Sequence, residues 1–323
     1  MTDITAAPAP LAGGGGDGPE MTAAAMHPDA VRGTSLWASA WGELRRNPLF
    51  WISLVLIVIF VVMAAFPQLF TSTDPRRADL NLARQRPSLN GGGIFGYDGQ
   101  GYDVYARTIY GARASILVGV LATLVTTVVG ALIGLIAGYR GGWVDAVAAR
   151  VGEVFFALPL LLGGILFLFT FPNDINTPLI VQVLKIVAFI ALLGWPNIAR
   201  LMRSSVLQVK PNDYVQAARA LGASNTRIVF RHILPNALAP VIVVSTINLG
   251  AYIAAEATLS FLGIGLQPPA VSWGIAISDG SAIGLIRVAP HMLLFPSIFL
   301  SLTVLAFIML GDAVRDALDP KLR

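Results

Sequence analysis

Apolar residues along this chain gather in long runs separated by shorter polar segments. A run of about 20 residues is long enough to cross a bilayer as one helix. The predicted membrane spans are 49–70, 114–138, 147–171, 179–198, 237–262 and 292–310. Backbone polar groups inside a membrane must bond to one another, and runs of this length satisfy that need as helices. The pattern therefore predicts an all-α integral membrane protein built as a bundle of six helices.

Composition and charge agree with this class and add an orientation. Apolar residues make up 55% of the chain, charged residues only 12%, and the mean hydropathy is +0.72, far from soluble proteins. If both termini are inside, fourteen of the 22 lysines and arginines lie in cytoplasmic segments. We therefore predict cytoplasmic termini, although segment 71–113 is locally basic against this rule. The basic residues flank apolar runs, so the net charge of +4 indicates no nucleic-acid partner.

The same pattern divides the chain into segments. Residues 1–35 are rich in Ala, Gly, Pro and Thr and are predicted to be a disordered cytoplasmic tail. Residues 36–70 form a charged lead-in and the first span, and 71–113 an extracytoplasmic insertion. The first half of that insertion is either an irregular small subdomain that contacts a partner or a loosely ordered loop. Residues 114–323 form the core, which contains a polar loop at 211–236.

Enzyme chemistry is scarce in this sequence. The chain has no cysteine, so thiolate metal sites and cysteine nucleophiles are excluded. A phosphate-cradling P-loop needs a lysine directly after a glycine, but Lys185, Lys210 and Lys321 follow Leu, Val and Pro. No histidine pair has metal-ligand spacing. We expect no catalytic residue, no metal and no cofactor bound by this chain.

Two features within the spans carry structural hypotheses. Gly130, Gly134 and Gly138 recur at four-residue spacing, which predicts a helix face that approaches a neighbouring helix closely. Glu256 is an acid placed well inside a span, where acids are costly and suggest function. It either lines a pathway, or pairs with a polar group such as Asn248, Ser260 or a partner-chain residue; we favour pairing.

The polar segment 211–236 has the features of two short helices joined by a turn. Residues 214–221 are good helix formers, and Gly222 predicts the end of that helix. A second helix is predicted from Ser224 or Asn225 to a point before Pro235. An arbitrary membrane protein would use such a segment as a solvated amphipathic connector, but the spacing of its residues is more specific than that.

This segment resembles the EAA loop of importer permeases in the ATP-binding-cassette (ABC) superfamily. The family pattern is Glu-Ala-Ala, three residues, Gly, nine residues, then Ile, any residue, Leu and Pro. The residues that match in register are Gln216 in place of the glutamate, Ala217, Ala218, Gly222, Leu234 and Pro235. Two positions depart from the pattern: Gln216 lacks the charge of glutamate, and His232 stands where the isoleucine is expected, with Ile233 beside it.

Three further stretches narrow the resemblance to the C-type permease subunits of the dipeptide and oligopeptide (peptide/nickel) family. These stretches are 95–119, which precedes and enters the second span, LSFLGIGLQPP followed by SWG within 259–274, and the ending GDAVRDALDPKLR. The usual Gly-Thr-Asp and Gly-Arg-Asp of the first stretch are altered to Gly96-Tyr97-Asp98 and Gly101-Tyr102-Asp103. Together the matches extend over nearly all of the chain after residue 40.

The resemblance implies a six-helix bundle of the type I ABC importer permease kind in a bacterial plasma membrane. It also implies a B-type permease partner, cytoplasmic ATPase subunits that bind ATP and Mg²⁺, and an extracytoplasmic substrate-binding protein. The helix that begins at the EAA motif would dock on the ATPase. The docking positions it implies are Tyr214, Gln216, Ala217, Ala218, Leu221 and Gly222. Substrates of such permeases include dipeptides, longer peptides, nickel chelates, glutathione and haem, and the sequence does not choose among them.

An alternative is a self-contained secondary transporter or a membrane-embedded enzyme. A secondary transporter predicts coupling-ion acids in several spans or an inverted repeat. Glu256 alone fits the first requirement, and the sequence has no clear repeat. We therefore favour a permease subunit driven by a separate ATPase.

Overall fold

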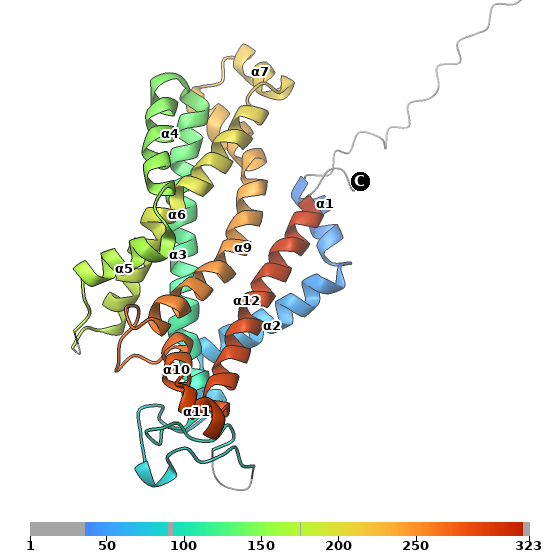
Figure 1. Ribbon diagram of the computed structural model, residues 1–323. Helices are drawn as coiled ribbons and strands as arrows, with labels where there is room; N and C mark the ends of the chain where they lie inside the picture. Colours follow the sequence, from blue (N-terminus) through green and yellow to red (C-terminus); the bar gives the residue numbers. More distant parts are fainter. Residues whose placement is uncertain (1–35, 90–92, 175, 319–323) are drawn as a thin grey trace, which may run out of the picture. The chain divides into compact units, whose positions relative to one another are not determined.

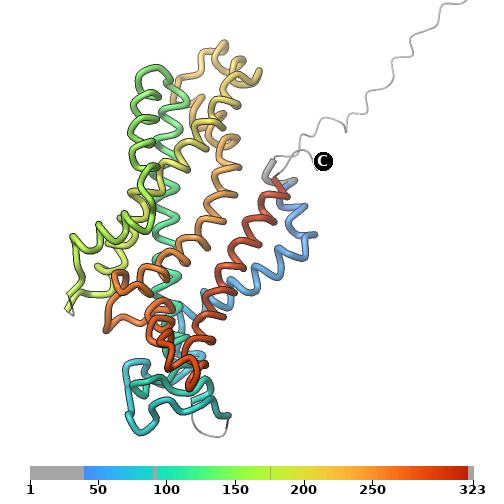
Figure 2. Tube along the Cα trace, in the orientation of Figure 1, coloured from blue at the N-terminus to red at the C-terminus, as the bar shows by residue number. Residues whose placement is uncertain are grey.

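The computed structural model describes residues 36–89, 93–174 and 176–318, and the regular elements within them are helices, accompanied by two isolated β-bridges (Figures 1 and 2). The predicted tail, residues 1–35, lies outside the described residues. The α-helices are α1 (Leu36–Leu44), α2 (Pro48–Ala65), α3 (Val104–Arg140), α4 (Gly142–Phe156), α5 (Leu160–Thr170), α6 (Leu179–Val209), α7 (Asp213–Ala220), α8 (Asn225–Arg227), α9 (Leu234–Phe261), α10 (Trp273–Gly280), α11 (Ile283–Val288) and α12 (His291–Leu318). Two 3₁₀ turns, η2 (Pro67–Leu69) and η3 (Leu80–Leu82), and one π-helical turn, η4 (Ile228–Ile233), accompany them.

Five helices in the described part of the chain are long and apolar enough to cross a membrane. They are α2, α3, α6, α12 and one helix that includes α8, η4 and α9 and runs from Asn225 to Phe261. The third predicted span, 147–171, is not straight, because α4 and α5 meet at 83°. Pro159 stands at the N-cap of α5, where its missing N–H and its ring prevent the helix from continuing. The all-α membrane fold is confirmed, with six spans if the bent pair counts as one.

Helix α3 begins earlier than the sequence predicted. It starts at Val104, ten residues before the expected start of the second span, so the predicted insertion 71–113 ends as helix. The carboxylate of Asp103 caps this start by accepting hydrogen bonds from the backbone N–H groups of Tyr105 (2.8 Å) and Ala106 (3.1 Å). The rest of the insertion lies at the opposite end of the bundle from α7 (Figure 1).

The three predicted close-approach glycines lie where α3 packs along α6. A β-carbon on Gly130 would stand only 2.7 Å from the carbonyl oxygen of Trp195, and one on Gly138 would stand 3.0 Å from that of Arg203. Gly134 is likewise buried against the α6 backbone. These positions therefore let the two backbones approach within a distance that any side chain would prevent, and the packing prediction is confirmed.

Candidate functional site

Helix α7 projects from the end of the bundle as an exposed polar helix held by one apolar anchor (Figure 1). Val215 is fully buried and packs in a cluster with Ile228, Ile233 and residues of α6. Asp213 in the first turn and Arg219 in the last turn complement the helix dipole. The remaining surface of the helix is free to meet another molecule.

The residues expected to dock on an ATPase lie mostly on this free surface. Those that are exposed are Tyr214, Gln216, Ala217, Leu221 and Gly222, and Ala218 is half-buried. Leu221 is 88% exposed at the end of the helix, where its side chain is accessible to another molecule. The structure thus places these side chains together around α7, with apolar and small groups accessible.

Gly222 ends α7 in a Schellman motif. Its φ is +79°, a left-handed conformation that glycine adopts without strain. The N–H of Ala223 donates to the carbonyl of Ala218, and the N–H of Gly222 donates to that of Arg219, both at 3.0 Å. Ser224 then caps the next helix by accepting from the N–H of Arg227. Gly222 therefore fixes the direction in which α7 leaves the long helix.

The second predicted helix of this segment does not end before Pro235. It continues through η4 and Pro235 into α9, so a single helix joins the polar segment to the membrane span. The π-helical turn accommodates the proline: Leu234 donates to the carbonyl of Val229, and the Asn236 side-chain amide donates to that of His232 (2.8 Å). The expected short helix is therefore the first part of the long helix Asn225–Phe261.

Both departures from the family pattern have local partners or packing in the structure. The side-chain amide of Gln216 donates to the Lys210 carbonyl at 3.1 Å, a bond that an ionised glutamate could not donate. Ile233, and not His232, is fully buried in the cluster under α7, while His232 is half-buried. The buried isoleucine thus follows the expected position by one residue.

Tyr139, near the end of α3, anchors the polar segment at two points that the sequence did not predict. Its hydroxyl donates to the Asn225 side chain at 2.7 Å, and its carbonyl accepts from the Lys210 ammonium at 2.7 Å. From the sequence, an aromatic residue at the end of a span indicates an anchor at the membrane interface, so these hydrogen bonds were not predictable. They hold both ends of the segment around α7 to α3.

An ion pair joins two helices beside this segment. The guanidinium of Arg203 on α6 bonds through two nitrogens to both carboxylate oxygens of Asp145 on α4. The pair lines a cavity of about 500 Å³ between α3, α4 and α6. It fixes α4 on α6 before the chain bends at Pro159.

Glu256 lies fully buried in α9 and pairs with its own helix. Its Oε1 accepts a hydrogen bond from the Ser260 hydroxyl at 2.7 Å, and that hydroxyl in turn accepts from the N–H of Leu266 at 3.0 Å. The Ser115 hydroxyl of α3 is close to the carboxyl group, but neither that hydroxyl nor Oε2 has a hydrogen-bond partner in the described part of the chain. Asn248 is half-buried and makes no hydrogen bond with Glu256 among the described residues. Of the partners weighed, Ser260 is the one found.

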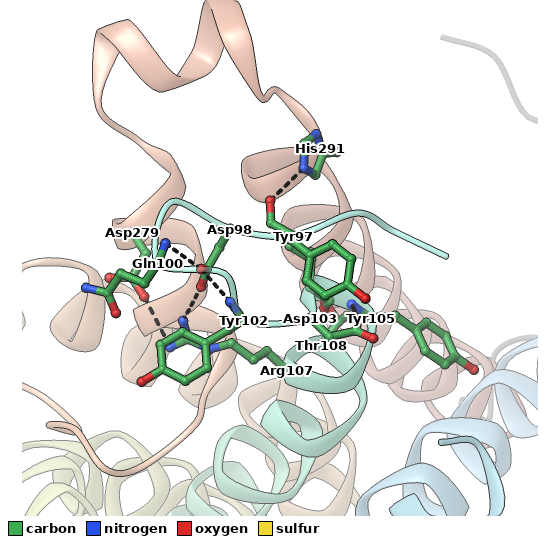
Figure 3. A network of polar contacts seen from close by, with 11 residues as sticks. Tyr97, Asp98, Gln100, Tyr102, Asp103, Tyr105, Arg107, Thr108, Asp279 and His291 are labelled. Atoms are coloured by element: carbon green, nitrogen blue, oxygen red, sulfur yellow. Dashed lines mark hydrogen bonds and ion pairs between the residues drawn. The ribbon is translucent and has the colours of Figure 1, made fainter. Parts of the chain in front are cut away.

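A network of polar contacts joins the insertion to the helices beneath it (Figure 3). Arg107 on α3 bonds Asp98 of the insertion at 2.7 Å and Asp279 of α10 at 3.1 Å. The Nε2–H of His291, the first residue of α12, donates to the Tyr97 carbonyl at 3.0 Å. Asp98 and Asp103, in the altered family stretch, therefore have structural partners, whereas the role of Asp279 was not predicted from the sequence.

Comparisons with known proteins identify the family. Residues 130–323 match the model of the binding-protein-dependent transport system inner membrane component, and residues 35–87 match the N-terminal TM domain of oligopeptide transport permease C. The chain belongs to the binding-protein-dependent transport permeases. This permease is therefore a multi-pass bacterial membrane protein and a transport subunit.

Similar permeases span almost the whole chain. This chain is 37% identical over 289 residues to the oligopeptide transport system permease protein OppC of Bacillus subtilis (strain 168), and the alignment covers 90% of this chain and 91% of that protein. It is 38% identical to the dipeptide transport system permease protein DppC of the same organism, covering 91% and 89%. The glutathione transport system permease protein GsiD of Escherichia coli O1:K1 / APEC is 35% identical, covering 92% and 94%.

Proposed function

We propose that this permease is the C-type transmembrane subunit of an ABC importer for peptide-like substrates. With a B-type permease it forms the pathway, a substrate-binding protein delivers the substrate outside, and ATPase subunits that bind ATP and Mg²⁺ drive import from the cytoplasm. The observation that supports this best is α7, an exposed helix that is anchored by buried Val215 and joined through the turn at Gly222 to the membrane-spanning helix Asn225–Phe261. Such a helix can transmit the movement of a docked protein to the bundle.

The positions of α7 and the insertion support an orientation of the permease in the membrane. Helix α7 lies at one end of the bundle and the insertion at the other (Figure 1). The excess of basic residues on the α7 side favours that end, and both termini, in the cytoplasm. The insertion would then face the binding protein. In this arrangement ATP acts at one end of the permease and the substrate arrives at the other.

The substrate class rests on the relatives. Their names cover oligopeptides, dipeptides and glutathione, which share peptide bonds and charged termini. A secondary transporter has less support, because buried Glu256 bonds to Ser260 on its own helix instead of standing in a series of coupling acids.

Uptake into membrane vesicles tests the function directly. Vesicles would carry this permease and its B-type partner in the membrane, with or without the ATPase subunits, and the binding protein would be added outside. Labelled dialanine, tetraalanine and glutathione would be offered in separate assays, with ATP inside the vesicle compartment that corresponds to the cytoplasm. We expect ATP-dependent uptake of at least one probe, and only when the ATPase is present. Uptake undiminished by omission of the ATPase would overturn the proposal.

A further inference from the structure

Helix α10 is fixed to the end of α9 by close packing and a hydrogen bond. A β-carbon on Gly274 would stand 2.5 Å from the carbonyl oxygen of Ala257, so the two backbones are in near contact. The Ser278 hydroxyl donates to the Phe261 carbonyl at 2.9 Å. Fully buried Trp273 ties α10 to α3 through its indole N–H, which donates to the carbonyl of Thr108 at 2.8 Å. Any displacement of the outer end of α9 therefore acts on α10.

The same α9 belongs to the uninterrupted helix that begins at Asn225, beside α7. A helix of this kind moves as one body when a force acts at either end, because its backbone hydrogen bonds resist bending except at specific defects. The π-helical turn η4 is one such defect, close to α7, and Pro240 inside α9 is a second, so the part of the helix that leads to α10 lies beyond both. A continuous covalent and packed path thus leads from α7 to α10.

Asp279 extends this path from α10 to the insertion. Its carboxylate bonds Arg107, and Arg107 bonds Asp98 through its other terminal nitrogen (Figure 3). Asp98 is nearly buried and holds the insertion's turn by accepting from the N–H groups of Gln100 (2.8 Å) and Tyr102 (3.0 Å). The guanidinium lies 5.0 Å from the centre of the Tyr102 ring, which confines it further.

The Asp279 side chain is only partly covered, with 46% of its surface accessible to solvent. Burial raises the pKa of this carboxyl group above its usual range; the Asp98 charge raises it further, while Arg107 opposes both. Asp98 and Arg107 are the charged groups that face it from the insertion and α3. A raised pKa means that the ionised form is less favourable in the folded protein than in the unfolded chain. An ion pair with a carboxylate this exposed adds little to stability, so what it does depends on the elements that it joins, α3 and α10.

We propose that Asp279 is a positioning residue that couples α10 to the insertion, so that binding-protein docking outside and α7 movement inside are linked through its ion pair with Arg107. This inference rests on the proposed function. Asp279 touches neither substrate nor nucleotide; it sets where the insertion lies relative to the end of α9.

The test uses the complete reconstituted transporter and its cognate binding protein loaded with tetraalanine. Asp279→Asn keeps the shape of the side chain and removes its charge. ATP hydrolysis is measured without and with the loaded binding protein, and affinity for the binding protein is measured separately. We expect stimulation by the binding protein to fall at least about fivefold, the lower end of typical coupling between sites. Hydrolysis without the binding protein should persist, because α7 and its anchors are unchanged.

Two further variants separate positioning from general damage. Asp279→Glu keeps the charge and should retain more of the stimulation than Asp279→Asn. Glu153→Gln removes one partner of the exposed ion pair with Arg150 on α4, away from this path, and should behave as wild type. If Asp279→Asn is stimulated as strongly as wild type, the inference is overturned and the proposed function stands. If the wild-type complex is not stimulated at all, the proposed function fails with it.

Discussion

Replacing Gly222 with alanine tests whether the direction of α7 matters. The residue has a φ of +79°, and a β-carbon there would meet no atom within 4 Å, so the substitution introduces strain without a clash in this chain. A non-glycine residue in the left-handed conformation costs about 1–2 kcal/mol. The turn can relieve that strain by changing conformation, because α7 is held by the single buried side chain of Val215.

The expected magnitude follows from that cost. A change of 1–2 kcal/mol alters a two-state population by a factor of about 5–30. If only the native direction of α7 can dock, the apparent affinity for the ATPase falls by up to the same factor. Asparagine tolerates the left-handed conformation better than alanine, so Gly222→Asn should fall between alanine and wild type. A bulky residue adds a clash only with the docked partner.

Titrating purified ATPase against the permease in nanodiscs measures this affinity. Gly263 provides a matched control: it has a φ of +76°, open space around it, and the same two Schellman hydrogen bonds at the end of α9. Gly263→Ala should carry a similar strain and leave ATPase affinity unchanged. Equal affinity of wild type and Gly222→Ala would refute the reasoning, as would an equal loss in Gly263→Ala.

Substitutions at three other positions test separate parts of the structure. Gly130→Val should lower the free energy of unfolding by about 1–3 kcal/mol, and the thermal midpoint with it, because the valine side chain would collide with the α6 backbone. An unchanged midpoint in a thermal shift assay would contradict this packing. Glu256→Gln should retain folding and uptake, because the glutamine oxygen can still accept a hydrogen bond from Ser260. Glu256→Ala should lower the free energy of unfolding by about 1–3 kcal/mol, because it removes that acceptor. Loss of uptake in a well-folded glutamine variant would instead indicate a charge in the pathway. Asp279→Asn should have a thermal midpoint equal to or above that of wild type at neutral pH, and this difference should disappear on acidification. The pKa of Asp279 is raised in the folded protein, so the protonated wild-type side chain at low pH favours folding more than the ionised side chain at neutral pH does. A lower midpoint for the variant at neutral pH would contradict that sign.

Local features were predictable because they depend on neighbours in sequence. Apolar run length located the spans, and glycine chemistry located the end of α7 at Gly222. The same local rules gave the wrong end for the second helix, since Pro235 normally marks a boundary and here a π-helical turn absorbs it. A proline such as Pro159 can kink or end a helix, but the apolar run continues through it, so the sequence predicted one span where the structure has two helices at an angle.

Long-range partners were not predictable. Arg107, Asp98 and Asp279 come from three elements, and no spacing rule joins them. The short helix α10 lies in a stretch rich in Gly, Pro and Ser that reads as a loop, yet packing of Trp273 orders it. Two of the insertion's arginines have partners of this kind: Arg107 is paired with acids, and Arg113 donates to the free carbonyls of Ala64 and Ala65 at the end of α2.

The most direct test of the central claim is the accessibility of position 221 with and without the ATPase. The natural chain has no cysteine, so Leu221→Cys provides a single reactive thiol at an 88% exposed site. Trp143→Cys, on the exposed start of α4, is the control. In inside-out membranes, a maleimide should label both thiols, and added ATPase should protect position 221 while position 143 stays reactive. Equal labelling of position 221 with and without bound ATPase would contradict docking at α7.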